Sequence, residues 1–121
     1  MILVDTSVWV DHLRAGDAQL VDLLESGAVL GHPLVIGEIA CGNLADRRPV
    51  LALLQHLPMA SETQADETLA YLHRHKLHGR GIGYIDVSLL ASTALTSGAR
   101  LWTRDRRLHA VAREMGLAYG S

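Results

Sequence analysis

The stretch Ile2-Leu3-Val4-Asp5-Thr6-Ser7 decides the fold of this chain. Its first three residues are apolar without polar alternation, which is typical of a strand buried on both faces of a parallel sheet. Asp5 follows this strand directly, and ligands of such sheets bind beyond the carboxyl ends of the strands. We therefore expect Asp5 to lie at the edge of a parallel sheet where a functional site forms.

Helical patterns follow the first strand. Ser7 offers a capping oxygen to a helix that ends near Gly16, and Asp17 caps a second pattern that ends near Gly27. Pro33 suits the first turn of a third helix, and the apolar residues around this helix predict that it is largely buried. The first third of the chain is therefore predicted to be one strand followed by helices.

The second half of the chain repeats this alternation. Ser61 with Gln64 resembles a capping box that opens a helix, and a glycine-rich loop stops it. Asp86 opens the next helix, residues 101–103 predict a strand, and residues 106–115 predict a closing helix. Helices that alternate with short apolar strands predict an α/β sandwich with a parallel sheet.

The composition indicates one globular domain with an aliphatic core. The 121 residues are 49% hydrophobic and include no Phe, and this length is typical of a single domain. Because 13 Asp and Glu residues outnumber 11 Lys and Arg residues, no global positive field steers the protein onto nucleic acid. Any affinity for phosphate groups must therefore be local.

The cysteine content and the apolar runs indicate the compartment. Cys41 is the only cysteine, so the chain has no intramolecular disulfide, and a single thiol fits a reducing compartment. The N-terminal apolar run is too short for a signal peptide, and no segment reaches the ~20 apolar residues of a membrane span. We therefore expect a cytoplasmic protein without a membrane partner.

Four acidic residues are candidates for one shared site. Asp105 follows the second predicted strand as Asp5 follows the first, Glu38 interrupts an apolar helix, and Asp86 opens another helix. A carboxylate that is buried needs a cation, a hydrogen-bond cluster or solvent. Capping explains most of these acids singly, but four of them in one small domain favour a shared site. Their oxygen ligands suit Mg²⁺ or Mn²⁺.

The order of these motifs resembles that of PIN-domain nucleases over nearly the whole chain. The motifs are Val4-Asp5-Thr6-Ser7, Glu38 in an apolar helix, Asp86 before Val87-Ser88-Leu89-Leu90-Ala91, and Trp102-Thr103-Arg104-Asp105. The resemblance implies a single PIN domain over residues 1–121, folded as an α/β/α sandwich with a small parallel central sheet flanked by helices. The compact size is similar to the VapC branch, the ribonuclease toxins of type II toxin–antitoxin pairs.

The resemblance also implies roles for particular residues. The catalytic and metal-binding set would be Asp5, Glu38, Asp86 and Asp105. Thr103 matches a hydroxyl position that orients the site, whereas Thr6 and Ser7 can either hydrogen-bond the same carboxylates or cap the helix. One departure is that Arg106 and Arg107 stand where some family members carry a further acid, so a second metal site is left open.

The implied activity is Mg²⁺-dependent endonucleolytic hydrolysis of RNA, with Mn²⁺ as a substitute and a 5′ phosphate as a product. Toxins of the VapC branch inhibit translation and are held inactive by a VapB-like antitoxin. We expect a groove between the early helices to receive an amphipathic antitoxin helix. We also expect a homodimer, because a small chain so rich in aliphatic residues leaves some of them on its surface.

Basic residues near the acids are candidates for RNA phosphate contacts. Arg80 lies in the glycine-rich loop, and Arg104 and Arg106 flank Asp105. A solvated surface explains each of these side chains equally well. Three histidines between residues 73 and 78 are divided between helix faces by their spacing, so we predict no zinc site there.

Other functions remain open at this point. One alternative is a solitary PIN nuclease that acts in RNA processing, which the presence or absence of a neighbouring antitoxin gene distinguishes. Another is a catalytically silent PIN-like module for RNA binding or assembly, which would normally lack one or more of the four acids. A haloacid-dehalogenase type of phosphoryl transfer requires a second acid where Ser7 stands, and that alternative is weak.

Overall fold

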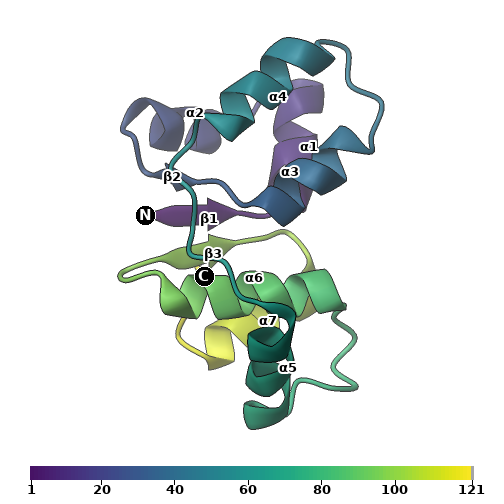
Figure 1. Ribbon diagram of the computed structural model, residues 1–121. Helices are drawn as coiled ribbons and strands as arrows, with labels where there is room; N and C mark the ends of the chain where they lie inside the picture. The colour runs from purple at the N-terminus through teal and green to yellow at the C-terminus, as the bar shows by residue number, and fades with distance from the viewer. Residues whose placement is uncertain (121) are drawn as a thin grey trace.

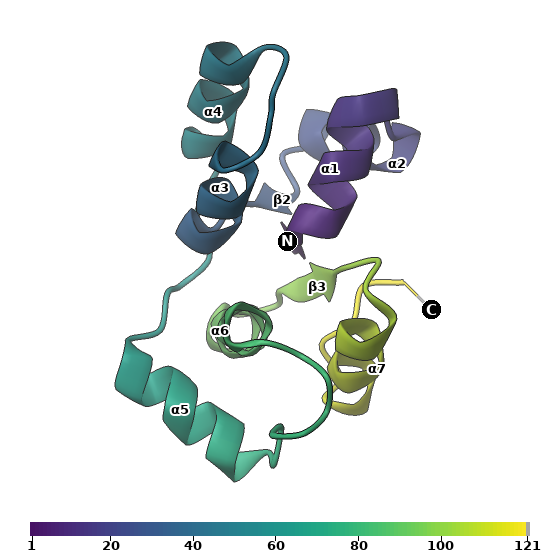
Figure 2. The ribbon, with the colours of Figure 1, turned by 90° about the vertical axis from the view of Figure 1, so that its right-hand side faces the viewer.

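The computed structural model describes residues 1–120. Within that range three strands and seven helices follow one another as β1 (Ile2–Val4), α1 (Thr6–Ala15), α2 (Ala18–Glu25), β2 (Val29–Leu30), α3 (Pro33–Ala40), α4 (Arg47–Gln55), α5 (Ala65–Arg74), α6 (Tyr84–Leu95), β3 (Arg100–Trp102) and α7 (Arg106–Glu114). Helices α1 to α4 cover one side of the sheet, and helices α5 to α7 cover the other (Figures 1 and 2). The predicted α/β/α sandwich with a small parallel central sheet is confirmed.

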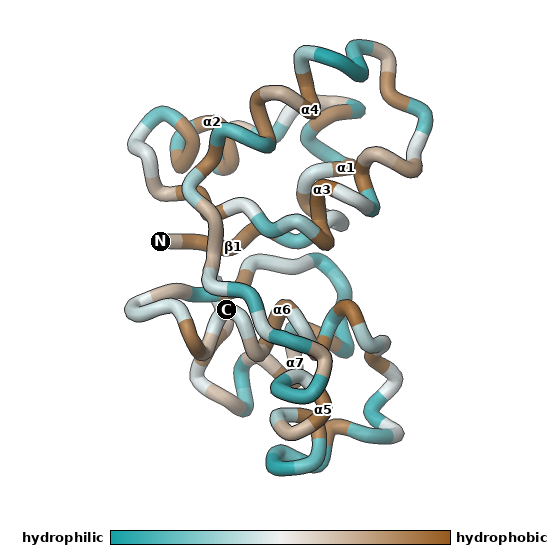
Figure 3. The backbone as a smooth tube through the Cα atoms, viewed as in Figure 1, coloured by the Kyte–Doolittle hydropathy of each residue, from teal (hydrophilic) through white to brown (hydrophobic). Residues whose placement is uncertain are grey.

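The sheet has the order β2-β1-β3, and both pairings are parallel. All three residues of β1 are buried, as predicted for an apolar triplet covered on both faces. Val4 is in register with Trp102, so the residues that follow β1 and β3 leave the sheet at the same edge. The tube in Figure 3 carries the hydrophobic colour along β1 at the centre of the molecule.

The C-terminal segment extends the sheet beyond β3. The Leu101 amide donates to the carbonyl of Leu117 at 2.7 Å, and the Tyr119 amide donates to the carbonyl of Leu101 at 2.9 Å. These bonds hold the side chain of Tyr119 beside Trp102, with 5.4 Å between the ring centroids. The C-terminal segment therefore belongs to the wall of the molecule next to β3.

Helix α6 is the buried helix of the fold. Seven consecutive residues, Val87 to Thr93, are buried between the sheet and the surrounding helices. Its small hydroxyl side chains satisfy their hydrogen bonds locally: Ser88 donates to the Tyr84 carbonyl at 3.1 Å and Thr93 to the Leu89 carbonyl at 2.7 Å. The buried position of α6 fixes the residues at its N-terminus, among them Asp86.

Helix α3 is less buried than predicted. Only Val35 and Ile39 are buried on it, whereas Leu34 and Glu38 are exposed. The prediction was wrong because α3 packs through one stripe against α1 and α4 in the outer layer. The Pro33 start is confirmed, and the exposed face leaves Glu38 accessible.

Two predicted helix caps differ from the structure, and one is confirmed. Asp17 caps α2 by accepting from the Leu20 amide at 2.9 Å. Ser7 does not cap α1, because this helix begins at Thr6 and the Ser7 hydroxyl instead donates to Asp5. The capping box of α5 lies three residues after Ser61, since the Gln64 amide donates to Glu67 at 2.7 Å.

No helix within residues 1–120 is long and apolar enough to cross a membrane.

Candidate active site

Asp5 is a buried carboxylate at the carboxyl end of β1. It is 7% exposed, and its side chain makes no capping bond to α1. The hydroxyls of Ser7 and Thr103 both donate to its Oδ2 atom, each at 2.8 Å. The Asp5 amide donates to the Trp102 carbonyl at 2.9 Å, so the sheet register itself places Asp5 beside Thr103.

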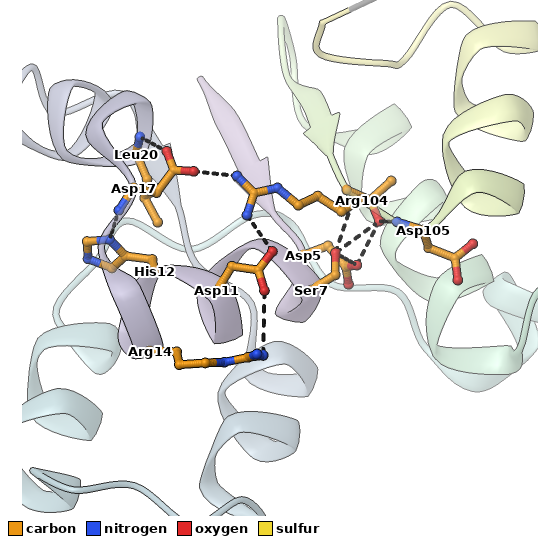
Figure 4. A network of polar contacts seen from close by, with 10 residues as sticks. Asp5, Ser7, Asp11, His12, Arg14, Asp17, Leu20, Arg104 and Asp105 are labelled. Atoms are coloured by element: carbon orange, nitrogen blue, oxygen red, sulfur yellow. Dashed lines mark hydrogen bonds and ion pairs between the residues drawn. The ribbon is translucent and has the colours of Figure 1, made fainter.

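Backbone amides after β3 set the direction of these hydroxyl bonds. The Arg104 amide donates to Ser7 Oγ at 3.0 Å, and the Asp105 amide donates to Thr103 Oγ1 at 3.1 Å. Because each hydroxyl oxygen accepts from an amide, its proton is directed to Asp5. Figure 4 shows this network around Asp5. The orienting role expected of Thr103 therefore has a direct geometric basis.

Glu38 comes from the exposed face of α3 and is held by α1. Thr6, the first residue of α1, donates its hydroxyl to Glu38 Oε1 at 2.7 Å. Thr6 directly follows Asp5, so this bond ties Glu38 to the end of β1. Sequence reasoning left Thr6 and Ser7 open between capping and binding the acids, and the structure shows both hydroxyls on the acids.

Asp86 is the third residue of α6 and is partly buried. Its Oδ2 atom accepts from the Gly83 amide at 3.0 Å, so the expected first-turn role at this helix is confirmed. Burial raises the pKa of Asp86 and the Gly83 bond opposes this, while the negative charges of Asp5, Asp105 and Glu38 raise it further. The four predicted acids therefore share one electrostatic neighbourhood.

Asp105 is the exposed member of the set. It caps α7, because its Oδ1 atom accepts from the Leu108 amide at 2.9 Å. Asp105 therefore both caps a helix and belongs to the acid group, and the same is true of Asp86. Each of the four acids is held by a different donor: a hydroxyl pair for Asp5, a hydroxyl for Glu38, and an amide for each of the other two.

The donor set fits a divalent cation in ligand type and in charge. Carboxylate oxygens are the ligands that Mg²⁺ and Mn²⁺ prefer, and four like charges near one another favour a cation between them. In the described part of the chain, no three His, Cys, Asp or Glu side chains are close enough to form a ready metal site. The carboxylates therefore have to move closer together to share one ion.

The predicted phosphate-binding arginines differ from one another in their contacts. Arg80 pairs with Glu114 at 2.7 Å. Arg104 pairs with Asp11 at 2.6 Å and also with Asp17, and its guanidinium lies 5.6 Å from the centre of the Trp102 ring. Figure 4 shows this side chain extended away from Asp105.

Arg106 makes no ion pair among residues 1–120. Of the three arginines it is therefore the one whose charge is available to a ligand. Sequence reasoning missed the acids that engage Arg104, because Asp11 and Asp17 lie 93 and 87 residues away in the chain and no local pattern connects such positions.

An apolar groove adjoins Glu38 on the α1, α3 and α4 side. Its cavity has a volume of about 450 Å³ and is lined by Val10, Leu13, Arg14, Glu38, Ile39, Gly42, Asn43, Leu44, Ala45, Asp46 and Val50. Other apolar residues of the early helices, among them Val8, Trp9 and Leu54, belong to the core. Glu38 therefore belongs both to the lining of the groove and to the candidate active site.

Comparisons with known proteins agree with this architecture. A family model described as PIN domain matches residues 2–114. Two curated relatives, both named Ribonuclease VapC32, come from Mycobacterium tuberculosis strains CDC 1551 and H37Rv. Each is 52% identical to this chain over 118 residues, which covers 98% of this chain and 95% of the relative.

Proposed function

This chain belongs to the PIN-domain family, and on that basis we propose that it is a metal-dependent endoribonuclease that acts as the toxin of a type II toxin–antitoxin pair. The relatives' name, Ribonuclease VapC32, supports the substrate class and the branch of the family. The observation that carries the proposal is the hydrogen-bond network at the end of β1, in which Thr103 and Ser7 hold Asp5 and Thr6 holds Glu38. The four acids come from separate parts of the fold: Asp5 precedes α1, Glu38 lies on α3, Asp86 lies on α6 and Asp105 precedes α7.

The protein's own contribution to catalysis is to orient these acids. Thr103 and Ser7 fix one oxygen of Asp5, and Thr6 fixes one oxygen of Glu38. A bound Mg²⁺ ion, for which Mn²⁺ substitutes, would supply Lewis acidity and charge neutralisation for hydrolysis of a phosphodiester bond. These hydrogen bonds limit the orientations of the carboxylates, which favours a defined ligand arrangement once an ion draws them closer together.

The experiment is cleavage of single-stranded RNA by the purified chain in Mg²⁺, with EDTA as the negative condition. We expect Asp5→Asn and Asp86→Asn each to remove nearly all cleavage, and the double variant to lose little more, because residues of one site are not additive. Asp66→Asn is the matched control, since Asp66 is an exposed first-turn acid of α5. Cleavage at the wild-type rate by folded Asp86→Asn would contradict a shared site.

The toxin assignment implies a partner protein that inhibits the active site. We propose that cleavage of cellular RNA inhibits translation, and that an amphipathic helix of a VapB-like antitoxin occupies the groove of about 450 Å³ beside Glu38. The apolar lining fits the apolar face of such a helix. A basic side chain on the partner would pair with the acids and compete with both cation and substrate phosphate.

Coexpression with the adjacent small protein tests this assignment. We expect a stable complex with suppressed cleavage. Val10→Asp should weaken the complex by about tenfold or more, because an unpaired charge in an apolar groove is costly. Val10 lines the groove and is 42% exposed, while Val21 on α2 is 36% exposed and lies outside the groove. Val21→Asp is therefore the matched control. If neither the neighbour's product nor its C-terminal half copurifies with the chain, the toxin assignment fails.

A further inference from the structure

A second, smaller cavity lies next to the candidate active site. It has a volume of about 310 Å³, and its walls include Gln19, Trp102, Thr103, Arg106, His109 and Tyr119. Helix α7, the end of β3 and the C-terminal segment therefore meet around it. This volume is at the lower end of the ~300–1,000 Å³ range of ligand pockets, which suits one planar group better than a helix.

Two residues connect this cavity to the acids. Thr103 lines the cavity and donates its hydroxyl to Asp5 at 2.8 Å. Arg106 lines it as well and directly follows Asp105. A polymer whose phosphate lies at the four acids therefore has its neighbouring unit within reach of this cavity.

His109 is the unexplained residue of the cavity wall. Both of its ring nitrogens are buried, and neither has a hydrogen-bond partner among the residues that the structure describes. Such groups are rare in folded proteins, because a buried polar atom without a partner costs free energy. A neutral imidazole donates at one nitrogen and accepts at the other, which matches the mixed donor and acceptor edge of a nucleobase.

The other walls supply aromatic surface and positive charge. Trp102 and Tyr119 lie with 5.4 Å between ring centroids, and Gln19 donates to the Tyr119 hydroxyl at 2.8 Å. Arg106 makes no ion pair within residues 1–120, so its charge is available to a ligand. Proteins that read single-stranded RNA stack its bases on aromatic and arginine planes and hydrogen-bond their edges.

We propose that this cavity is a nucleotide subsite for the RNA unit beside the cleaved bond. In it the His109 ring, whose two nitrogens are covered in this conformation, turns toward the cavity and hydrogen-bonds the base, Arg106 pairs with the flanking phosphate, and Tyr119 provides aromatic contact. His109 is then a specificity-determining residue. The inference rests on the proposed ribonuclease function for the identity of the polymer, but the recognition of a nucleotide is a separate property of the cavity.

The first test is cleavage of a randomised single-stranded RNA by His109→Gln and Arg106→Gln. We expect His109→Gln to flatten the base preference next to the cleavage site and to raise KM about tenfold with a smaller change in kcat, because a lost base contact weakens binding. The matched controls are His73→Gln on the exposed face of α5 and Arg113→Gln at the exposed end of α7. An unchanged base preference and KM in folded His109→Gln overturns the subsite.

The second test needs neither cleavage nor a variant. The imidazole signals of His109 are followed by NMR in the wild-type protein during titration with nucleoside monophosphates in EDTA, with inorganic phosphate, a nucleoside and a glutamate-rich peptide as parallel arms. We expect saturable shifts with at least one nucleotide and smaller ones with phosphate alone. Shifts that are equal for inorganic phosphate or for the peptide, or no shift at all, overturn base recognition.

The two proposals fail in different ways. A chain that binds nucleotides at His109 but cuts no RNA retains the subsite and loses the ribonuclease assignment. If the chain cuts RNA and His109→Gln changes neither base preference nor KM, the ribonuclease assignment stands and the subsite is disproved.

Discussion

Thr103 connects two of the four candidate acids through a single hydroxyl. Its oxygen accepts from the Asp105 amide, and its proton is donated to Asp5. The Asp105 backbone therefore helps to orient the Asp5 carboxylate. Such partners of metal-binding carboxylates have a large influence on activity although they are not ligands.

We predict that Thr103→Val lowers RNA cleavage about 10–100-fold while the protein stays folded. Valine keeps the shape of the side chain but leaves Asp5 with one hydroxyl donor, Ser7, in place of two. Cleavage rates and melting temperatures are compared with those of Thr63→Val, whose hydroxyl contacts Thr68. Equal rates for the two variants would show that Asp5 is oriented without Thr103.

The acids of the candidate site that follow strands could be predicted from the sequence. Asp5 and Asp105 follow neighbouring parallel strands, and the apolar residues before each of them made these strands predictable. The pairing of Arg104 with Asp11 and Asp17 was not predictable, because it depends on how α1, α2 and β3 pack in three dimensions.

At the scale of elements, α3 depends on one buried histidine. His32 is 2% exposed, its Nδ1 atom accepts from the Leu34 amide at 3.1 Å, and its Nε2 atom lies 3.0 Å from the Ser92 hydroxyl. Burial lowers the pKa of His32, and the charge of Glu62 opposes this. Because Nδ1 accepts, the neutral ring carries its proton on Nε2 and joins α3 to α6.

This arrangement predicts a loss of stability in mild acid. The pKa of His32 is lower in the folded state than in the unfolded state, where it is about 6.5. As the pH falls below that value the unfolded chain takes up a proton that the folded chain does not, so the free energy of unfolding decreases. Urea denaturation between pH 8 and pH 5 should show this decrease in the wild type and a smaller one in His32→Asn.

Asparagine keeps a capping acceptor at the start of α3 but does not titrate in this range. His73→Asn is the control, because His73 is exposed on α5. An identical pH dependence in His32→Asn and the wild type would remove His32 as its cause.

The elements that sequence analysis missed or misjudged share a physical origin. Strand β2 has only two residues, Val29 and Leu30, too few for a periodic pattern, and it exists because it pairs with β1. Helix α3 is rich in apolar residues, but its position in the outer layer leaves Leu34 exposed. Longer elements with clear stop signals, such as α7, were predicted to within one residue of their ends.

At the scale of the whole molecule, a metal ion held by the proposed acid group would couple folding to the concentration of metal. A cation that binds only the folded chain stabilises it, and at a hundredfold excess over Kd the melting temperature of a domain of this size should rise by roughly 5–15 °C. The measurement is thermal unfolding in MgCl₂ and in MnCl₂ against NaCl of equal ionic strength. Asp86→Asn should reduce the shift strongly, and an equal rise in NaCl would mean that ionic strength alone is responsible.

The surface predicts self-association. Leu53 on α4 and Leu95 on α6 are each 55% exposed, and Tyr84 is 49% exposed, so large apolar side chains are accessible to a second copy of the chain. We therefore expect a homodimer in sedimentation experiments at micromolar concentration. A single species at the chain mass of 13.1 kDa would contradict this expectation.

The distance along the chain between the two ends of the site has a consequence for synthesis. Asp5 is oriented by Thr103, which follows it by 98 residues, and the central strand β1 has no β3 neighbour until residues 100–102 have been made. Pairings between such distant segments form late in folding. A growing chain that ends before β3 lacks both Thr103 and Asp105. If the chain is the toxin we propose, the ribosome that makes it is therefore exposed to its activity only after Thr103 and Asp105 have been made.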